Sequence, residues 1–399
     1  MSEQEMLPER ETRESLTLNS PYFDVALGVV REKIPEKESQ IRRVLEVIDR
    51  EGVENFSLFR PKDYPGVALP FTRINVTKLT NELFGLNSEP KRQEKEQGTI
   101  SSPRRLYFIF PGFAFPPAGH PFTPWDIVYD RVISLFPQII NPIRKGETIP
   151  QIEVLVLGSP NGLGGKVSEE WVTALKDKGI PQYGQVSAEF VRKALPEEQN
   201  ELENTWIILQ GMSMGSTVAE HTYLELPELK QKLQLLLDNP AGLHERVLAL
   251  LKGIQIPLGF LGEATVRGLF DQRVRNVIEA ENVFLKKLEE MLQQRGIIEK
   301  DNQEQKKLKR KAALTDALNL IKGSSFDTES IRSFIRQGLY DPTSFSPSVF
   351  LRTLLQTLQG KTPVLGKGRS LTFPILATHF INRYRVEKWG RIIDFASKH

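Results

Sequence analysis

Residues 205–216 read TWIILQGMSMGS. The apolar run at 206–209 is typical of a strand that is buried on both faces. Gly-x-Ser-x-Gly follows directly, with Ser213 at its centre, and predicts a sharp strand-to-helix turn that strains the serine backbone. Gly211 and Gly215 fit this turn, because a side chain at either position would collide with the neighbouring turn. We therefore predict that Ser213 stands above the strand ends as a nucleophile.

This stretch resembles the nucleophile elbow of the α/β-hydrolases, in which Gly-x-Ser-Met-Gly followed by a small residue is common. The resemblance implies a doubly wound, mostly parallel sheet with an inserted helical cap. It also implies acyl transfer to water through an acyl-enzyme on Ser213, with the amide of Met214 in the oxyanion hole. Because this fold hosts many chemistries and some inactive members, two hypotheses stay open. One is a serine ester or acyl hydrolase, and the other is an inactive or truncated α/β-hydrolase scaffold with a binding role.

The surrounding sequence alternates between predicted strands and helices, which favours a parallel, doubly wound sheet. Apolar runs predict strands at 106–110, 152–157 and 232–237, and helices are predicted at 185–195 and 216–226. The loop at 158–166 superficially resembles a phosphate-binding loop. Val167, however, stands where a Ser or Thr would bind magnesium, so no nucleotide site is predicted.

A second oxyanion donor and a pocket are expected after the strand at 106–110. That strand ends in Pro-Gly-Phe where the family has His-Gly-x, so the resemblance implies that Phe113 N–H is the donor. The following loop, 114–125, carries Phe115 and His120. In the family this loop would line the acyl or leaving-group side of a pocket, to which we also assign Met212. The alternative is a stiff surface loop whose aromatic residues pack on the core.

Asp238 is the candidate acid. It leaves the strand beside the nucleophile strand, where a carboxylate can orient an imidazole. The segment Asp-Asn-Pro-Ala that begins here is similar to the Asp-Pro-Ala segment of pancreatic-type lipases. The alternative is that Asp238 caps the helix that follows.

A histidine base is harder to assign. A serine of ordinary pKa needs an imidazole within about 3 Å to remove its proton. The strand predicted at 373–378 and the helix at 386–398 resemble the family's penultimate strand and helix, so the final strand and its histidine are expected to be absent. The turn after the strand at 373–378, residues 379–383, contains no carboxylate. His379 is the candidate substitute base or, alternatively, a pocket histidine, and His120 is an equally open candidate.

Four segments are predicted. Residues 1–20 read as a disordered tail, and 21–242 form the first part of the core, with a mobile loop at about 87–104. Residues 243–368 are predicted to form a helical cap, and 369–399 to complete the core. Within the cap, apolar residues at helical spacing predict helices at 274–292, 312–321 and 327–337. In the first part of the core, the apolar run at 23–30 predicts a strand.

Composition narrows the function classes. The chain has 399 residues, with 53 Lys and Arg against 50 Asp and Glu, so the net charge of +3 indicates no nucleic acid partner. The absence of cysteine excludes disulfides, thiolate metal sites and a cysteine nucleophile. No run of 18 apolar residues predicts a transmembrane segment, and the cytoplasm is the simplest location. We expect a small, hydrophobic acyl substrate and no metal or cofactor, and the sequence gives no oligomeric state.

Overall fold

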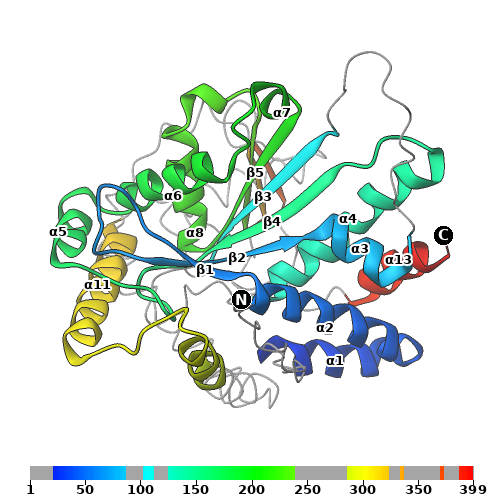
Figure 1. Cartoon of the computed structure of the whole chain (residues 1–399), viewed down its shortest axis with the longest axis horizontal. Helices are drawn as coiled ribbons and strands as arrows, with labels where there is room; N and C mark the ends of the chain where they lie inside the picture. Colours follow the sequence, from blue (N-terminus) through cyan, green and yellow to red (C-terminus); the bar gives the residue numbers. More distant parts are fainter. Residues whose placement is uncertain are drawn as a thin grey trace, which may run out of the picture.

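A single mixed sheet runs through the centre of the molecule (Figure 1). The computed structural model describes residues 21–86, 102–111, 125–238, 285–322, 333–336, 369–372 and 386–398. Within these described residues, eight strands form the sheet in the order β1-β2-β4-β3-β5-β6-β7-β8. Their bounds are β1 Phe56–Phe59, β2 Leu69–Asn75, β3 Arg104–Phe110, β4 Gln151–Leu157, β5 Thr205–Met212, β6 Leu233–Asp238, β7 Ser333–Arg336 and β8 Arg369–Thr372.

Strand direction divides the sheet into two parts. β2 pairs antiparallel with both β1 and β4. All pairs from β4 to β8 are parallel, so the carboxyl ends of these strands meet at one edge of the sheet. β3 and β5 lie in the interior of this parallel part, which explains their nearly continuous apolar runs.

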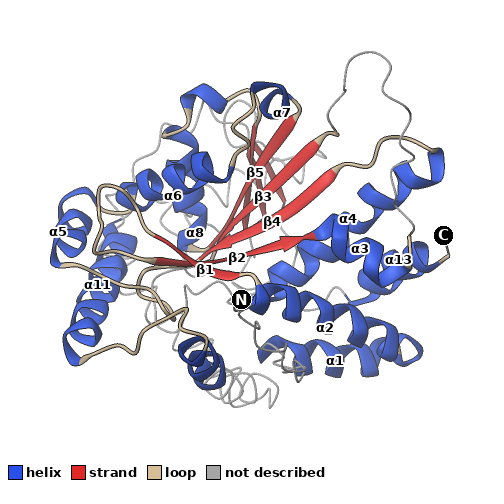
Figure 2. Cartoon of the chain, viewed as in Figure 1, coloured by secondary structure: helices blue, strands red, loops and turns tan. Residues whose placement is uncertain are grey.

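Helices cover both faces of the sheet (Figure 2). One face packs against α1 (Pro21–Lys33), α2 (Glu38–Glu54), α3 (Val76–Phe84), α4 (Trp125–Lys145) and α13 (Val386–Ser397). The other packs against α5 (Glu169–Lys178), α6 (Pro181–Ala194), α8 (Met214–Leu224) and α11 (Gln303–Lys322), and the short α7 (Gln199–Glu203) precedes β5.

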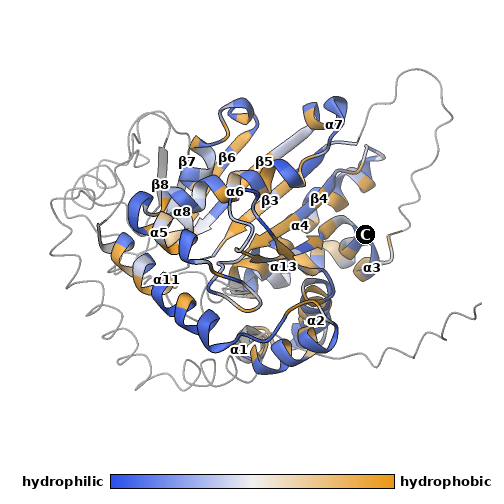
Figure 3. Ribbon diagram, turned by 60° about the vertical axis from the view of Figure 1, so that its left-hand side comes forward, coloured by the Kyte–Doolittle hydropathy of each residue, from blue (hydrophilic) through white to orange (hydrophobic). Residues whose placement is uncertain are grey.

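Alternating side chains of β5 enter the two cores. Ile208 and Met212 pack on the α4 side, whereas Ile207 and Leu209 pack on the α8 side. This alternation follows from the two-residue period of a strand. Figure 3 shows hydrophobic residues along the central strands and hydrophilic residues along the outer turns of α11.

The N-terminal apolar run was predicted to be a strand, and this prediction is wrong. Residues 23–30 lie inside helix α1. Phe23, Leu27 and Val30 are buried at the i, i+4 and i+7 positions, a helical period that places them on one face against α2. An apolar run of eight residues is compatible with either a buried strand or a buried helix. No strong turn signal bounds this run, so the sequence alone did not distinguish the two structures.

The end of the chain differs from the prediction in two ways. Strand β7 replaces the helix predicted at 327–337, so the sheet resumes inside the range assigned to the cap. Strand β8 pairs with β7 and ends just before the strand predicted at 373–378, which lies outside the described residues. β8 is the last strand in the described part of the chain, and the predicted absence of a final strand and its histidine stays a prediction. These two four-residue strands are too short to give a clear period-two pattern.

The other predicted segments are described only in part. Within the cap range, residues 285–294 and α11 are helical where helices were predicted at 274–292 and 312–321. The predicted tail at 1–20 and residues 87–101 of the predicted mobile loop lie outside the described residues, and β3 begins at Arg104. In the part of the chain that the structure describes, no helix has both the length and the hydropathy needed to cross a membrane.

Candidate functional site

Ser213 occupies the turn between β5 and α8. Its φ of 54° and ψ of −127° make it the only non-glycine residue with positive φ among the described residues. A non-glycine residue held in so sparsely populated a conformation costs about 1–3 kcal/mol, and such strain is concentrated at functional sites. The turn itself is therefore the one that the sequence predicted. Ser213 is half-buried, while its neighbours Met212 and Met214 are buried.

Both flanking glycines are required by close backbone contacts. A Cβ atom on Gly211 would lie 2.3 Å from the carbonyl oxygen of Gly215. A Cβ atom on Gly215 would lie 2.0 Å from the carbonyl oxygen of Phe110, at the end of β3. These atoms are backbone and cannot move aside, so the turn excludes any side chain at 211 or 215.

The end of β6 supports the same turn. Ser213 N–H donates to the carbonyl oxygen of Asp238 at 2.9 Å, and the Ser216 hydroxyl donates to that oxygen at 3.3 Å. Met214 is the first residue of α8, so its N–H is one of the four that a helix cannot pair internally. The positive end of the helix dipole adds to this donor. This position is compatible with the oxyanion donor predicted at Met214, which stays a prediction.

The carboxylate of Asp238 is buried on the α4 side of the sheet. Asp238 pairs with Met212 in the parallel register, and its Oδ2 accepts a hydrogen bond from Gln210 Nε2 at 2.8 Å. Gln210 Oε1 accepts in turn from Arg131 Nε at 2.8 Å. Gln210 and Arg131 were not among the predicted site residues. The signal available was a single glutamine inside the apolar run of the nucleophile strand.

His221 does not suit the role of base. It follows Ser213 by eight residues along α8, which is about 12 Å of helix. Burial lowers its pKa from 6.5 to about 4, and its Cβ faces Gly184 of α6. His221 is therefore a neutral packing residue between two helices at neutral pH.

The structure brings together three of the predicted site residues, Ser213, Met214 and Asp238. Met212, assigned to the pocket, packs in the core on the α4 side. Phe113, Phe115, His120 and His379 lie outside the described residues. In chain order, the segment 373–385, which holds His379, connects β8 to α13.

The strand order, the antiparallel β2 and the strained serine directly after β5 together decide the fold. The chain has the α/β-hydrolase fold. In this fold the serine of Gly-x-Ser-x-Gly is exposed at the carboxyl edge of the sheet, where Ser213 lies.

No protein-family model matches the chain, and no curated protein sequence matches it significantly. Among solved structures, it is similar to MGS-M2, an alpha/beta hydrolase enzyme from a Medee basin deep-sea metagenome library (10% identity, TM-score 0.41, covering 86% of this chain and 98% of that one). It is also similar to a thermophilic esterase from Thermogutta terrifontis (11% identity, TM-score 0.40, covering 85% of this chain and 97% of that one). A third similar structure is the thioesterase domain from the curacin biosynthetic pathway (10% identity, TM-score 0.37, covering 86% of this chain and 99% of that one). Because these TM-scores lie below 0.5, the α/β-hydrolase assignment rests on the strand order and the elbow.

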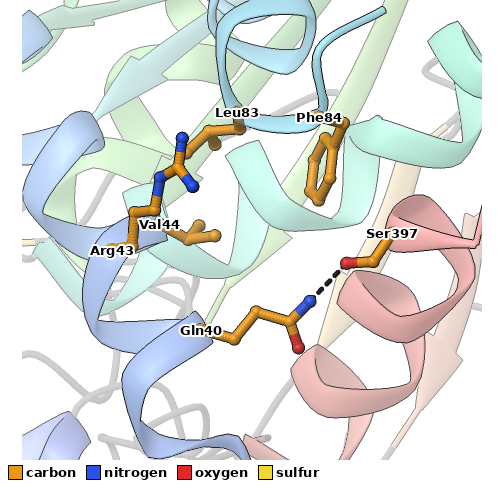
Figure 4. A pocket seen from close by; sticks show the side chains of 6 residues that line it. All are labelled: Gln40, Arg43, Val44, Leu83, Phe84 and Ser397. Carbon is orange, nitrogen blue, oxygen red and sulfur yellow. Dashed lines mark hydrogen bonds between the residues drawn. The ribbon is translucent and has the colours of Figure 1, made fainter.

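A small pocket lies elsewhere on this α/β-hydrolase fold (Figure 4). Its volume is about 220 Å³, and α2, α3 and α13 supply the lining residues Gln40, Arg43, Val44, Leu83, Phe84 and Ser397. Gln40 donates a hydrogen bond to Ser397 across it. None of the predicted site residues lines this pocket, so we do not assign it to the site around Ser213.

Proposed function

We propose that this protein is a serine hydrolase that cleaves an ester or related acyl substrate through an acyl-enzyme on Ser213. The observation that carries the proposal is the backbone of Ser213, which is held at φ 54° between β5 and α8. Two glycines and the carbonyl oxygen of Asp238 maintain this conformation. Strain that is enforced from several sides at a half-buried serine is typical of a catalytic nucleophile.

The proposed chemistry has two steps. Ser213 Oγ attacks the acyl carbonyl while an imidazole accepts the hydroxyl proton, and the carbonyl oxygen becomes an oxyanion. The N–H of Met214, with the predicted Phe113 N–H, would stabilise this charge. The oxyanion then collapses, the leaving alcohol takes the proton from the imidazole, and the acyl group stays on Ser213. Water attacks the acyl-enzyme in the same way and releases the acid.

Asp238 and His379 are proposed as the acid and the base. Asp238 ends the strand beside β5, and its side chain is already held by a hydrogen bond. His379 follows β8, so the residues occur in the order Ser, Asp, His along the chain, which is the order of α/β-hydrolases. His120 remains the alternative base. The aromatic residues of the loop at 114–125 favour a hydrophobic acyl group in the substrate.

A fluorophosphonate probe tests the nucleophile. We expect the full-length protein to be labelled at Ser213, as identified by mass spectrometry of the labelled peptide, because the probe reacts only with an activated serine. Ser213→Ala should abolish labelling, whereas Ser187→Ala, which changes a buried serine on α6, should leave the rate unchanged. A folded protein that is not labelled would support the binding scaffold instead.

The same assay identifies the base. Loss of a general base lowers the rate by about 10²–10⁴-fold. We expect this loss in His379→Gln and a change of less than threefold in His120→Gln. The opposite pattern would transfer the role to His120, and a full rate in both variants would exclude both histidines.

A further inference from the structure

Gln210 is a polar residue in the interior of the nucleophile strand. Its side chain is 1% exposed and lies between Leu209 and Gly211 in β5. A buried amide is costly unless its oxygen and its NH2 group are both hydrogen-bonded. Gln210 meets this requirement, because Oε1 accepts from Arg131 Nε and Nε2 donates to Asp238 Oδ2, each at 2.8 Å.

The chemistry of the two partners fixes the direction of this amide. A guanidinium can only donate, so it must face the amide oxygen, and an ionised carboxylate can only accept, so it must face the NH2 group. The flipped amide would place two donors together at Arg131 and two acceptors together at Asp238. Arg131 is itself held over the ring of Tyr107, 5.4 Å from its centroid.

Asp238 is thereby fixed through both of its polar groups. Its main-chain oxygen accepts from Ser213 N–H, and its side chain is held by Gln210 on the α4 face. Gln210 lies two residues before Met212, the register partner of Asp238, so both side chains project from the same face of the sheet. The nucleophile strand therefore orients the carboxylate of the neighbouring strand.

We propose that Gln210 and Arg131 are positioning residues that orient Asp238 as the acid of the hydrolytic site, an inference that rests on the proposed function. Gln210 acts on Asp238 directly, and Arg131 acts on Asp238 through Gln210. A carboxylate has about four lone-pair positions, so the hydrogen bond from Gln210 to Oδ2 does not prevent Asp238 from accepting an imidazole N–H as well. A misoriented acid would displace the imidazole, and small displacements in a catalytic group cost about 10²-fold in rate.

The test measures the rate constant of fluorophosphonate labelling at Ser213 in variants of the full-length protein. Gln210→Met keeps the length of the side chain and removes both hydrogen bonds, and we expect labelling to slow about 10- to 100-fold. Gln182→Met is the matched control, since Gln182 is equally buried but lies on α6, on the opposite face of the sheet. We expect its rate to stay within twofold of the original protein.

Two further variants separate positioning from packing. Arg131→Lys, which retains a donor, should be labelled faster than Arg131→Met.

The two proposals fail in different ways. Absence of labelling in the unaltered protein overturns the serine hydrolase and this inference with it. Normal labelling in the unaltered protein combined with an unchanged rate in Gln210→Met overturns the positioning role alone. Equal rates in Arg131→Lys and Arg131→Met overturn the role of Arg131.

Discussion

Ser213 shows how one residue can be placed under strain by its surroundings. It has positive φ, and the glycines on either side, Gly211 and Gly215, lie directly against backbone atoms. The position is therefore costly for stability and useful for exposing the hydroxyl.

Replacing Ser213 by glycine or alanine separates strain from chemistry. Both variants should lose labelling, but glycine adopts positive φ without steric cost and alanine does not. After the entropic cost of glycine is subtracted, we expect Ser213→Gly to be about 1 kcal/mol more stable than Ser213→Ala. Urea unfolding of the two variants measures the difference. Equal stability would show that the backbone of residue 213 relaxes in solution.

Gly215 and Gly28 provide a matched pair of helix glycines. Gly215→Ala would force a Cβ to within 2.0 Å of a backbone oxygen of β3, and we expect it to cost at least about 3 kcal/mol. A Cβ atom on Gly28 in α1 would meet no atom of another segment within 4 Å, so Gly28→Ala should raise stability by up to about 1 kcal/mol. Thermal unfolding checks both values. A mild effect at 215 would contradict the close contact with Phe110.

At the scale of elements, α13 joins the end of the described chain to its N-terminal half. Its buried residues pack against α4 and α1, and Trp389 Nε1 donates to Asp130 Oδ1 of α4 at 3.3 Å. Trp389 also lies edge-on to Tyr129, whose hydroxyl donates to Asp49 of α2. The C-terminal helix thus closes the core on the α4 side of the sheet.

Replacing Trp389 and, separately, Trp206 by alanine tests how much the packing of α13 contributes to stability. Trp389 is 1% exposed, and its replacement by alanine should cost about 3–5 kcal/mol through loss of burial and a residual cavity. Trp206 on β5 is 49% exposed, so Trp206→Ala should cost less than about 1 kcal/mol. Urea denaturation measures both. Similar costs for the two variants would contradict the packing of α13 against α4.

At the scale of elements, sequence patterns were sufficient to predict some strands and insufficient for others. The runs of β3, β4, β5 and β6 were predicted because strands buried on both faces are apolar throughout. Helix α1 was mistaken for a strand, since a short apolar run fits either structure until its packing partner is known. β7 and β8 were missed because four residues carry too little pattern, and the sheet edge itself determines their conformation.

For the molecule as a whole, α11 is attached to a distant part of the chain through a buried carboxyl group. Asp316 Oδ2 accepts from Tyr183 Oη at 2.8 Å and from Asn161 Nδ2 at 2.9 Å. Its Oδ1 is also buried, with no hydrogen-bond partner among the described residues. Burial raises the pKa of Asp316 well above its usual value, although its two hydrogen bonds oppose that change. Burial therefore favours the neutral form of Asp316 over the ionised form in the folded protein.

This predicts a specific pH dependence of stability. A carboxyl whose pKa is raised on folding stabilises the protein fully below its unfolded pKa of 3.8, and this stabilisation is lost as pH rises towards the folded value. Asp316→Asn cannot titrate, so its free energy of unfolding should increase relative to the original protein above pH 4, by at most about 1.4 kcal/mol per pH unit. Urea unfolding of both proteins from pH 4 to 7 tests this. A constant difference would show that Asp316 is ionised in the folded state.

The sequence by itself determined the nucleophile turn and the strands on either side of it. These features are local: the two glycines are needed by the turn, and an apolar run identifies a strand covered on both faces. Only the tertiary structure decided that Gln210 and Arg131 hold Asp238, and that two four-residue strands extend the sheet beyond β6. The reason is that such contacts join side chains far apart in the chain, so no spacing within a single segment encodes them.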